Sequence, residues 1–145
     1  MKLDCWYPLE ARDNRLSTAL LLVRVVVGVG MALHGWPKFQ NMTTWMGEGS
    51  SAVPVVFIAL AAIAEFIGGL ALALGVFTPV ATFLMGCTML VAASFHIKRG
   101  DPWISKGGPA WELAGLYLVL SVMFFLVGPG RFSLDALITR RFRKS

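Results

Sequence analysis

The chain has 145 residues, enough for one domain; 57% of them are hydrophobic, only 14% are charged, and mean hydropathy is +0.70. Soluble globular domains carry about 25% charged residues, so this composition excludes an ordinary soluble protein and indicates an integral membrane protein. The net charge of +5 comes from basic residues that flank apolar runs. It therefore favours a role in topology and contact with anionic lipid headgroups, with no nucleic-acid partner.

The first two apolar runs are predicted to be transmembrane helices. Residues 1–15 form a polar tail, and the run at 16–33 follows with Arg24 inside it. The run at 53–74 is almost wholly apolar, contains the single carboxylate Glu65, and can cross a hydrocarbon core of about 30 Å. Because it is rich in glycine and alanine, which allow close approach of helices in lipid, we expect the other helices to pack against it.

Two further apolar runs complete the predicted bundle. The short sequence GVFTP at 75–79 leads into a third span at 79–95, and a fourth span at 109–127 ends at a Gly-Pro-Gly sequence. In the basic tail at 128–145, Ser133 is a candidate N-cap of a final helix at the membrane interface. The predicted fold is all-α, an integral membrane four-helix bundle with short loops and a C-terminal interfacial helix.

The distribution of lysine and arginine predicts the orientation. The N-terminal tail, the 75–79 turn and the C-terminal tail hold 8 of these residues, whereas the loops after the first and third spans hold 4. The positive-inside rule then places both termini in the cytoplasm.

Two charged residues within the spans are predicted to form an ion pair. Arg24 and Glu65 lie about 12 and 15 Å from the predicted cytoplasmic ends of their spans, at a rise of about 1.5 Å per residue. Pairing would make both charges tolerable in lipid. One interpretation is a structural lock between two helices; the other is a relay, or a polar floor beneath a ligand.

A second polar layer is predicted near the outer face. His34 and Lys38 end the first span, His96 ends the third, and Glu112 begins the fourth. Histidine can transfer protons near neutral pH and lysine can stabilise a developing anion, so these four are the candidate catalytic residues. Ordinary interfacial polarity is the alternative. The candidate cofactor-binding residues around them are Trp36, Trp103 and Trp111.

Spacings typical of metal sites are not found in the sequence. It contains no HExxH, no CxxC and no histidine pair at i and i+4, so no metal site is predicted. No haem-attachment motif is present, and we expect no covalently bound cofactor. An electron-transfer cofactor would be diffusible, such as a quinone, or would belong to a partner.

Several short motifs, taken together, resemble the DoxX family of small bacterial membrane proteins over about residues 16–138. They are Arg24-x3-Gly28, His34-Gly35-x2-Lys38, Glu65-x2-Gly68-Gly69, Gly75-x2-Thr78, His96, Glu112 and Gly128-Pro129-Gly130-Arg131-x-Ser133-x-Asp135. The family's usual turn has arginine after the threonine, whereas this chain has Pro79. The resemblance implies a four-helix protein of the bacterial inner membrane, related to a subunit of thiosulfate:quinone oxidoreductase. Family members are often described as oxidoreductases and linked to sulfur oxidation, quinone handling or oxidative-stress complexes.

Three functions are consistent with these features. The first is a membrane oxidoreductase component that binds quinone in the outer polar layer and works with a soluble or membrane redox subunit. In it, His34 and His96 handle protons, Lys38 stabilises the anion, and Glu112 orients a histidine. The second is a non-enzymatic scaffold that recruits redox or stress-response proteins. The third is a small transporter, which would need a homo-oligomer to enclose a path. The sequence leaves open whether the protein is an enzyme.

Overall fold

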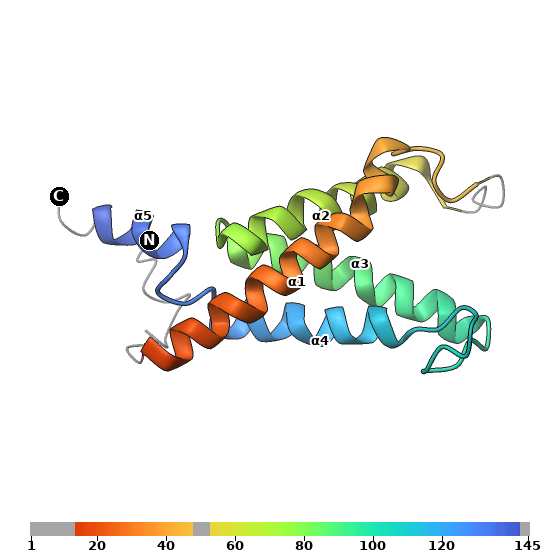
Figure 1. Ribbon diagram of the computed structural model, residues 1–145. Helices are drawn as coiled ribbons and strands as arrows, with labels where there is room; N and C mark the ends of the chain where they lie inside the picture. The colour runs from red at the N-terminus through yellow and green to blue at the C-terminus, as the bar shows by residue number, and fades with distance from the viewer. Residues whose placement is uncertain (1–13, 48–52, 143–145) are drawn as a thin grey trace.

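The computed structural model describes residues 14–47 and 53–142, which fold entirely as helices, turns and loops (Figure 1). Predictions for most of the N-terminal tail and for the last three residues lie outside these ranges. The helices are α1 (Asn14–Gln40), α2 (Val55–Leu74), α3 (Thr78–Lys98), α4 (Glu112–Val127) and α5 (Leu134–Phe142).

The helices confirm the predicted membrane bundle. α1, α2 and α3 are long and apolar enough to cross a membrane, and α4 is a shorter apolar helix of 16 residues, about 24 Å at 1.5 Å per residue. α1 continues seven residues past the predicted end at Leu33, and α3 continues to Lys98. His34, Lys38 and His96 are therefore helical residues with positions fixed by the helix rather than by a loop.

Two helical hairpins form the bundle. α1 packs on α2, α3 packs on α4, and α2 joins the hairpins through its contact with α3. The start of α1, the α2–α3 turn, the end of α4 and α5 gather at one end, named here the turn end (Figure 1). At the opposite end, the loop end, the hairpins diverge, and the loops after α1 and after α3 lie at separate corners.

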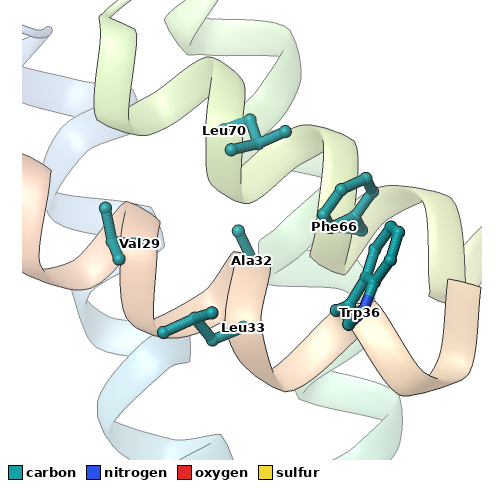
Figure 2. Close-up of a pocket in the computed structure, with 6 residues that line it drawn as sticks. All are labelled: Val29, Ala32, Leu33, Trp36, Phe66 and Leu70. Atoms are coloured by element: carbon teal, nitrogen blue, oxygen red, sulfur yellow. The ribbon is translucent and has the colours of Figure 1, made fainter.

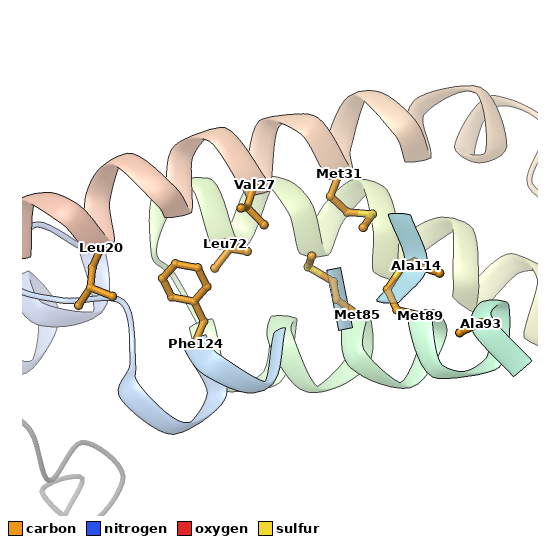
Figure 3. Close-up of a cluster of buried hydrophobic side chains, with 9 residues drawn as sticks. All are labelled: Leu20, Val27, Met31, Leu72, Met85, Met89, Ala93, Ala114 and Phe124. Atoms are coloured by element: carbon orange, nitrogen blue, oxygen red, sulfur yellow. The ribbon is translucent and has the colours of Figure 1, made fainter. Parts of the chain in front are cut away.

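The core between the hairpins is apolar, and so is the outer surface. The fully buried side chains of this core include Met31, Leu72, Met85 and Phe124 (Figure 3). Large apolar side chains such as Val26 and Val119 are about 70% exposed. Such a surface is unfavourable in water but suits the acyl chains of a bilayer.

α1 and α2 approach each other through small residues. A Cβ added to Gly28 would lie 2.5 Å from the backbone nitrogen of Ala73, and one added to Gly69 would lie 2.6 Å from that of Ala32. A Cβ on Gly35 would meet the backbone at Glu65 and Phe66. The two backbones are in contact along three turns, which is how transmembrane helices maximise packing in lipid. This contact fixes the register of α1 against α2.

Polar contacts hold α5 and the segment before it on the turn end. Gly75 ends α2 with a positive φ of 67°, and its carbonyl accepts a hydrogen bond from the Asp135 backbone N–H at 2.8 Å. The Asp135 carboxylate accepts hydrogen bonds from the N–H groups of Phe77 (2.9 Å) and Thr78 (3.0 Å). These donors begin α3, so Asp135 caps α3 from a distant part of the chain. Phe77 itself has a positive φ of 48°, a costly conformation for a bulky residue, which this cap helps to hold.

Ser133 is confirmed as the N-cap of α5. Its hydroxyl oxygen accepts a hydrogen bond from the Ala136 N–H at 3.2 Å, and the hydroxyl donates to the carbonyl of Gly130 at 2.7 Å. The Gly-Pro-Gly segment is held on the bundle by Arg24, which donates to the Pro129 carbonyl.

We predict that Gly69→Ala destabilises the protein, because its added methyl group would overlap the α1 backbone. Gly86 on α3 is the matched control, since an added Cβ there would meet only side-chain atoms at 3.5 Å or more. Thermal unfolding in detergent should show a lower melting temperature for Gly69→Ala, with Gly86→Ala unchanged or higher because alanine favours a helix. Equal melting temperatures in the two variants would contradict this packing.

We also predict that Asp135→Ala lowers stability by about 1–2 kcal/mol, the typical loss for an N-cap side chain. Asp135→Asn should recover only part of this loss, because its single amide oxygen can accept from one of the two N–H groups while its NH2 group faces the other. Chemical unfolding followed by circular dichroism measures both variants. Wild-type stability in Asp135→Ala would show that the cap is unimportant.

Candidate functional site

The predicted ion pair between Arg24 and Glu65 is wrong. Arg24 is 2% exposed and donates through Nη1 to the Pro129 carbonyl at 3.3 Å and through Nη2 to the Phe132 carbonyl at 2.7 Å. Two nitrogens of the buried guanidinium thus bind backbone carbonyls, Nε has no hydrogen-bond partner among the described residues, and the Asp135 carboxylate is the nearby counter-charge.

The helix register explains this error. Gly75 of α2 lies against Arg24, whereas Gly35 of α1 lies against Glu65. Arg24 and Gly35 are eleven positions apart on α1, about 16 Å along the axis. The depths of Arg24 and Glu65 below the ends of their spans are comparable only if the two spans end at the same level. The first turns of α1, however, extend past the α2–α3 turn and pack on the segment that follows α4 (Figure 1).

Glu65 instead forms an ion pair with Lys38. The Lys38 Nζ donates to Glu65 Oε1 at 2.8 Å and lies 2.7 Å from Oε2. Glu65 is 2% exposed and Lys38 is 20% exposed, so the pair joins a buried carboxylate to a partly accessible ammonium. The same Nζ lies 4.7 Å from the centre of the Trp45 ring, a cation–π contact. The sequence analysis identified both residues, but it paired Glu65 with Arg24 and gave Lys38 no partner.

Aromatic side chains and a histidine surround this pair. His34 lies one turn before Lys38 on α1, close enough to interact electrostatically with both Lys38 and Glu65. Trp36 and Phe39 pack on Phe66, with ring centres 5.0 and 4.8 Å away. Of these aromatic rings, that of Trp45 contacts the ion pair directly.

An apolar groove lies on the face shared by α1 and α2. Its volume is about 260 Å³. Trp36 and Phe66 lie together at one end of it (Figure 2). The side chains that line it are Val29, Ala32, Leu33, Trp36, Phe66 and Leu70.

The remaining predicted residues lie on the other hairpin. The Nδ1 atom of His96 is 2.7 Å from Oδ2 of Asp101, and Arg99 Nη2 is 3.2 Å from the same oxygen. The hydrogen bond to His96, followed by the charge of Arg99, keeps the pKa of the Asp101 carboxyl below its usual value. The carboxylate that orients His96 is thus Asp101, not Glu112 as predicted. Glu112 lies half-buried in the first turn of α4.

The two other candidate tryptophans accompany His96 rather than Lys38. Trp103 and Trp111 pack edge to face with ring centres 4.3 Å apart, and Trp103 covers Gly115. Because the loops after α1 and α3 lie at separate corners, the predicted single outer layer is two separate groups (Figure 1). One group contains His34, Lys38 and Trp36, and the other group contains His96, Trp103 and Trp111.

Sequence reasoning missed Trp45, Phe66 and Asp101. Asp101 could have been found from its spacing, since it follows His96 by five residues at a helix end. Phe66 gives no signal within an apolar run.

Among the described residues, no group of three or more His, Cys, Asp or Glu side chains is placed to hold a metal ion.

We predict that Lys38→Met or Glu65→Leu alone lowers stability by about 3–5 kcal/mol, because each strands a charge. The double variant should recover most of this loss, since it leaves two apolar side chains in an apolar surrounding. Thermal unfolding of the two single variants and the double variant forms a cycle that isolates the pair. Additive losses would show that the contact contributes no coupling.

Comparison with known proteins places the chain in a family. Residues 19–97 match the DoxX family. An uncharacterised protein of Haemophilus influenzae is 35% identical over 80% of this chain and 87% of its own length. "Putative oxidoreductase CatD" of Bacillus subtilis is 30% identical over 87% and 91%, and "Inner membrane protein YqjF" of Escherichia coli is 28% identical over 86% and 95%. No solved structure matches. The chain belongs to the DoxX family of membrane proteins.

Proposed function

We propose that this protein is a quinone-binding component of a membrane oxidoreductase, with its site on α1 and α2 at the loop end. The observation that carries the proposal is the Lys38–Glu65 pair, a buried carboxylate joined to a partly accessible ammonium, on a hairpin that also bears an apolar groove. A lipid-soluble redox ligand needs both features, an apolar surface for its chain and polar groups for its head. They occur together on this hairpin.

The groove suits the chain of such a ligand. Leu33 and Leu70 are 69% and 40% exposed on the face that we assign to lipid. A ligand dissolved in the bilayer could enter sideways, without crossing water. Ligand pockets are lined mostly by apolar side chains, as this groove is.

The polar end suits the head. Reduction of a quinone to a quinol takes up two electrons and two protons. In the proposed site, Lys38 faces the oxygen on which negative charge develops, and Glu65 holds the ammonium in place. His34 supplies or removes a proton, and Trp36 contributes to the apolar lining of the groove. This site uses only part of the predicted set, because His96 and Glu112 belong to the other hairpin.

The electrons would come from a partner, a soluble or second membrane redox subunit. The relative from Bacillus subtilis carries oxidoreductase in its name, which supports this class of function. With both termini in the cytoplasm of a bacterial inner membrane, the proposed site lies near the outer face. The relative from Escherichia coli is named as an inner membrane protein.

A scaffold is the second candidate. It is favoured by α5, which exposes Leu137 and Ile138 and ends in Arg140 and Arg141. In that case the ion pair is a structural lock and the redox chemistry belongs to recruited proteins.

The test is to purify the protein from native membranes in mild detergent and to measure extracted quinone by mass spectrometry. We expect near-stoichiometric quinone in the wild type. We expect at least a tenfold loss in two variants: Lys38→Met/Glu65→Leu, which removes the polar end, and Leu70→Trp, which fills the groove. His96→Ala is the control and should retain quinone. Absence of quinone from folded wild-type protein would contradict the proposal and favour the scaffold.

A further inference from the structure

The surface at the turn end combines exposed apolar side chains with arginines. On α5, Leu134, Leu137 and Ile138 are 40%, 58% and 47% exposed. Arg140 and Arg141 follow in the last turn. We propose that this surface, named here the α5 face, binds the headgroups of anionic phospholipids. This inference concerns a different part of the molecule from the proposed quinone site and does not depend on it.

Contacts with α1 fix the depth of the segment that leads into α5. Arg131 Nη1 donates to Asn14 Oδ1 at 3.0 Å, and Gly130 packs against Ser17 and Leu20. Arg24 binds two carbonyls of the same segment. The segment between α4 and α5 therefore runs beside the first three turns of α1.

Those turns of α1 carry an apolar exposed surface of their own. Leu16, Leu22 and Val23 are 46%, 62% and 38% exposed. Three apolar side chains open to the outside in one short stretch indicate contact with acyl chains. The segment beside them consequently lies at the edge of the hydrocarbon core, and α5 starts there.

The orientation of α5 is held by hydrogen bonds rather than left free. The Asp135 N–H binds Gly75, and its carboxylate binds the start of α3. Asp135, Ala136 and Thr139 are partly buried, whereas Leu134, Leu137 and Ile138 are exposed. The same apolar side chains are thus always presented outward, next to exposed Phe132.

The charges around the α5 face indicate that it binds anionic headgroups as well as contacting acyl chains. Within the described part of the turn end, arginine is exposed at positions 15, 131, 140 and 141, and the single carboxylate is Asp135, which is engaged on α3. A guanidinium presents a fork of donors that matches phosphate, and its long stem can lie on apolar surface. Apolar side chains at the hydrocarbon edge followed by arginines one turn later reproduce the order of acyl chain and phosphate in a lipid leaflet.

The first test measures lipid selectivity. The full chain in detergent is titrated with phosphatidylglycerol or with phosphatidylcholine, and bound lipid is counted by native mass spectrometry. A basic residue near an anionic surface contributes about fivefold in affinity, so Arg140→Gln/Arg141→Gln should bind phosphatidylglycerol about 25-fold more weakly and phosphatidylcholine unchanged. Lys98→Gln/Lys106→Gln at the loop end removes the same charge and should retain wild-type binding. Unchanged affinity in the first variant, or an equal loss in the second, overturns the proposal.

The second test reports the position of the α5 face directly. A polarity-sensitive fluorophore is attached to Leu137→Cys in a full chain with Cys5→Ser and Cys87→Ala, placed in nanodiscs of phosphatidylcholine and phosphatidylglycerol. We expect blue-shifted emission, as for an apolar environment. Emission typical of water overturns the proposal and indicates instead that the face is open to a protein partner.

Discussion

Backbone contact between α1 and α2 sets the positions on which the rest of the protein depends. Because Gly28 and Gly69 lack side chains, the two helices meet at a distance that only one register allows. That register brings Lys38 to Glu65 at one end and Arg24 to Gly75 at the other. Arg24 and Glu65, whose charges are costly to bury in lipid, thereby obtain partners. A shift by one turn would strand them, so packing and electrostatics specify the same arrangement.

The two ends of the bundle are built differently. At the turn end, Arg24, Gly75 and Asp135 tie together the start of α1, the α2–α3 turn and the start of α5. At the loop end the hairpins diverge, and each carries its own polar group. Many residues in the motifs by which the chain resembles its family, such as Arg24, Gly75 and Asp135, thus have a structural role. The Lys38–Glu65 pair is the exception, because it combines a buried carboxylate with a partly accessible cation.

The sequence was sufficient for the fold class and insufficient for the site. Long apolar runs, a glycine at position 75 and an N-cap at Ser133 are local signals, and the corresponding helices and caps are present. Pairing of charges between helices depends on register, which is set by small residues whose partners the sequence does not reveal. A prediction from the sequence can use only depth in the membrane, which pairs Arg24 with Glu65. The grouping of His34, Lys38, His96 and Glu112 failed similarly, since divergence of the hairpins is a three-dimensional property.

The contacts of Arg24 also constrain the order in which the protein can be completed during synthesis. Its two carbonyl partners lie 105 and 108 residues later in the chain. Helix α1 can enter the membrane early, but its guanidinium stays without these acceptors until nearly the whole polypeptide has emerged. A chain that stops after α4 would keep a buried, uncompensated cation and an uncapped α3. The arrangement therefore distinguishes a finished molecule, in which Arg24 and the start of α3 have these partners, from an unfinished one.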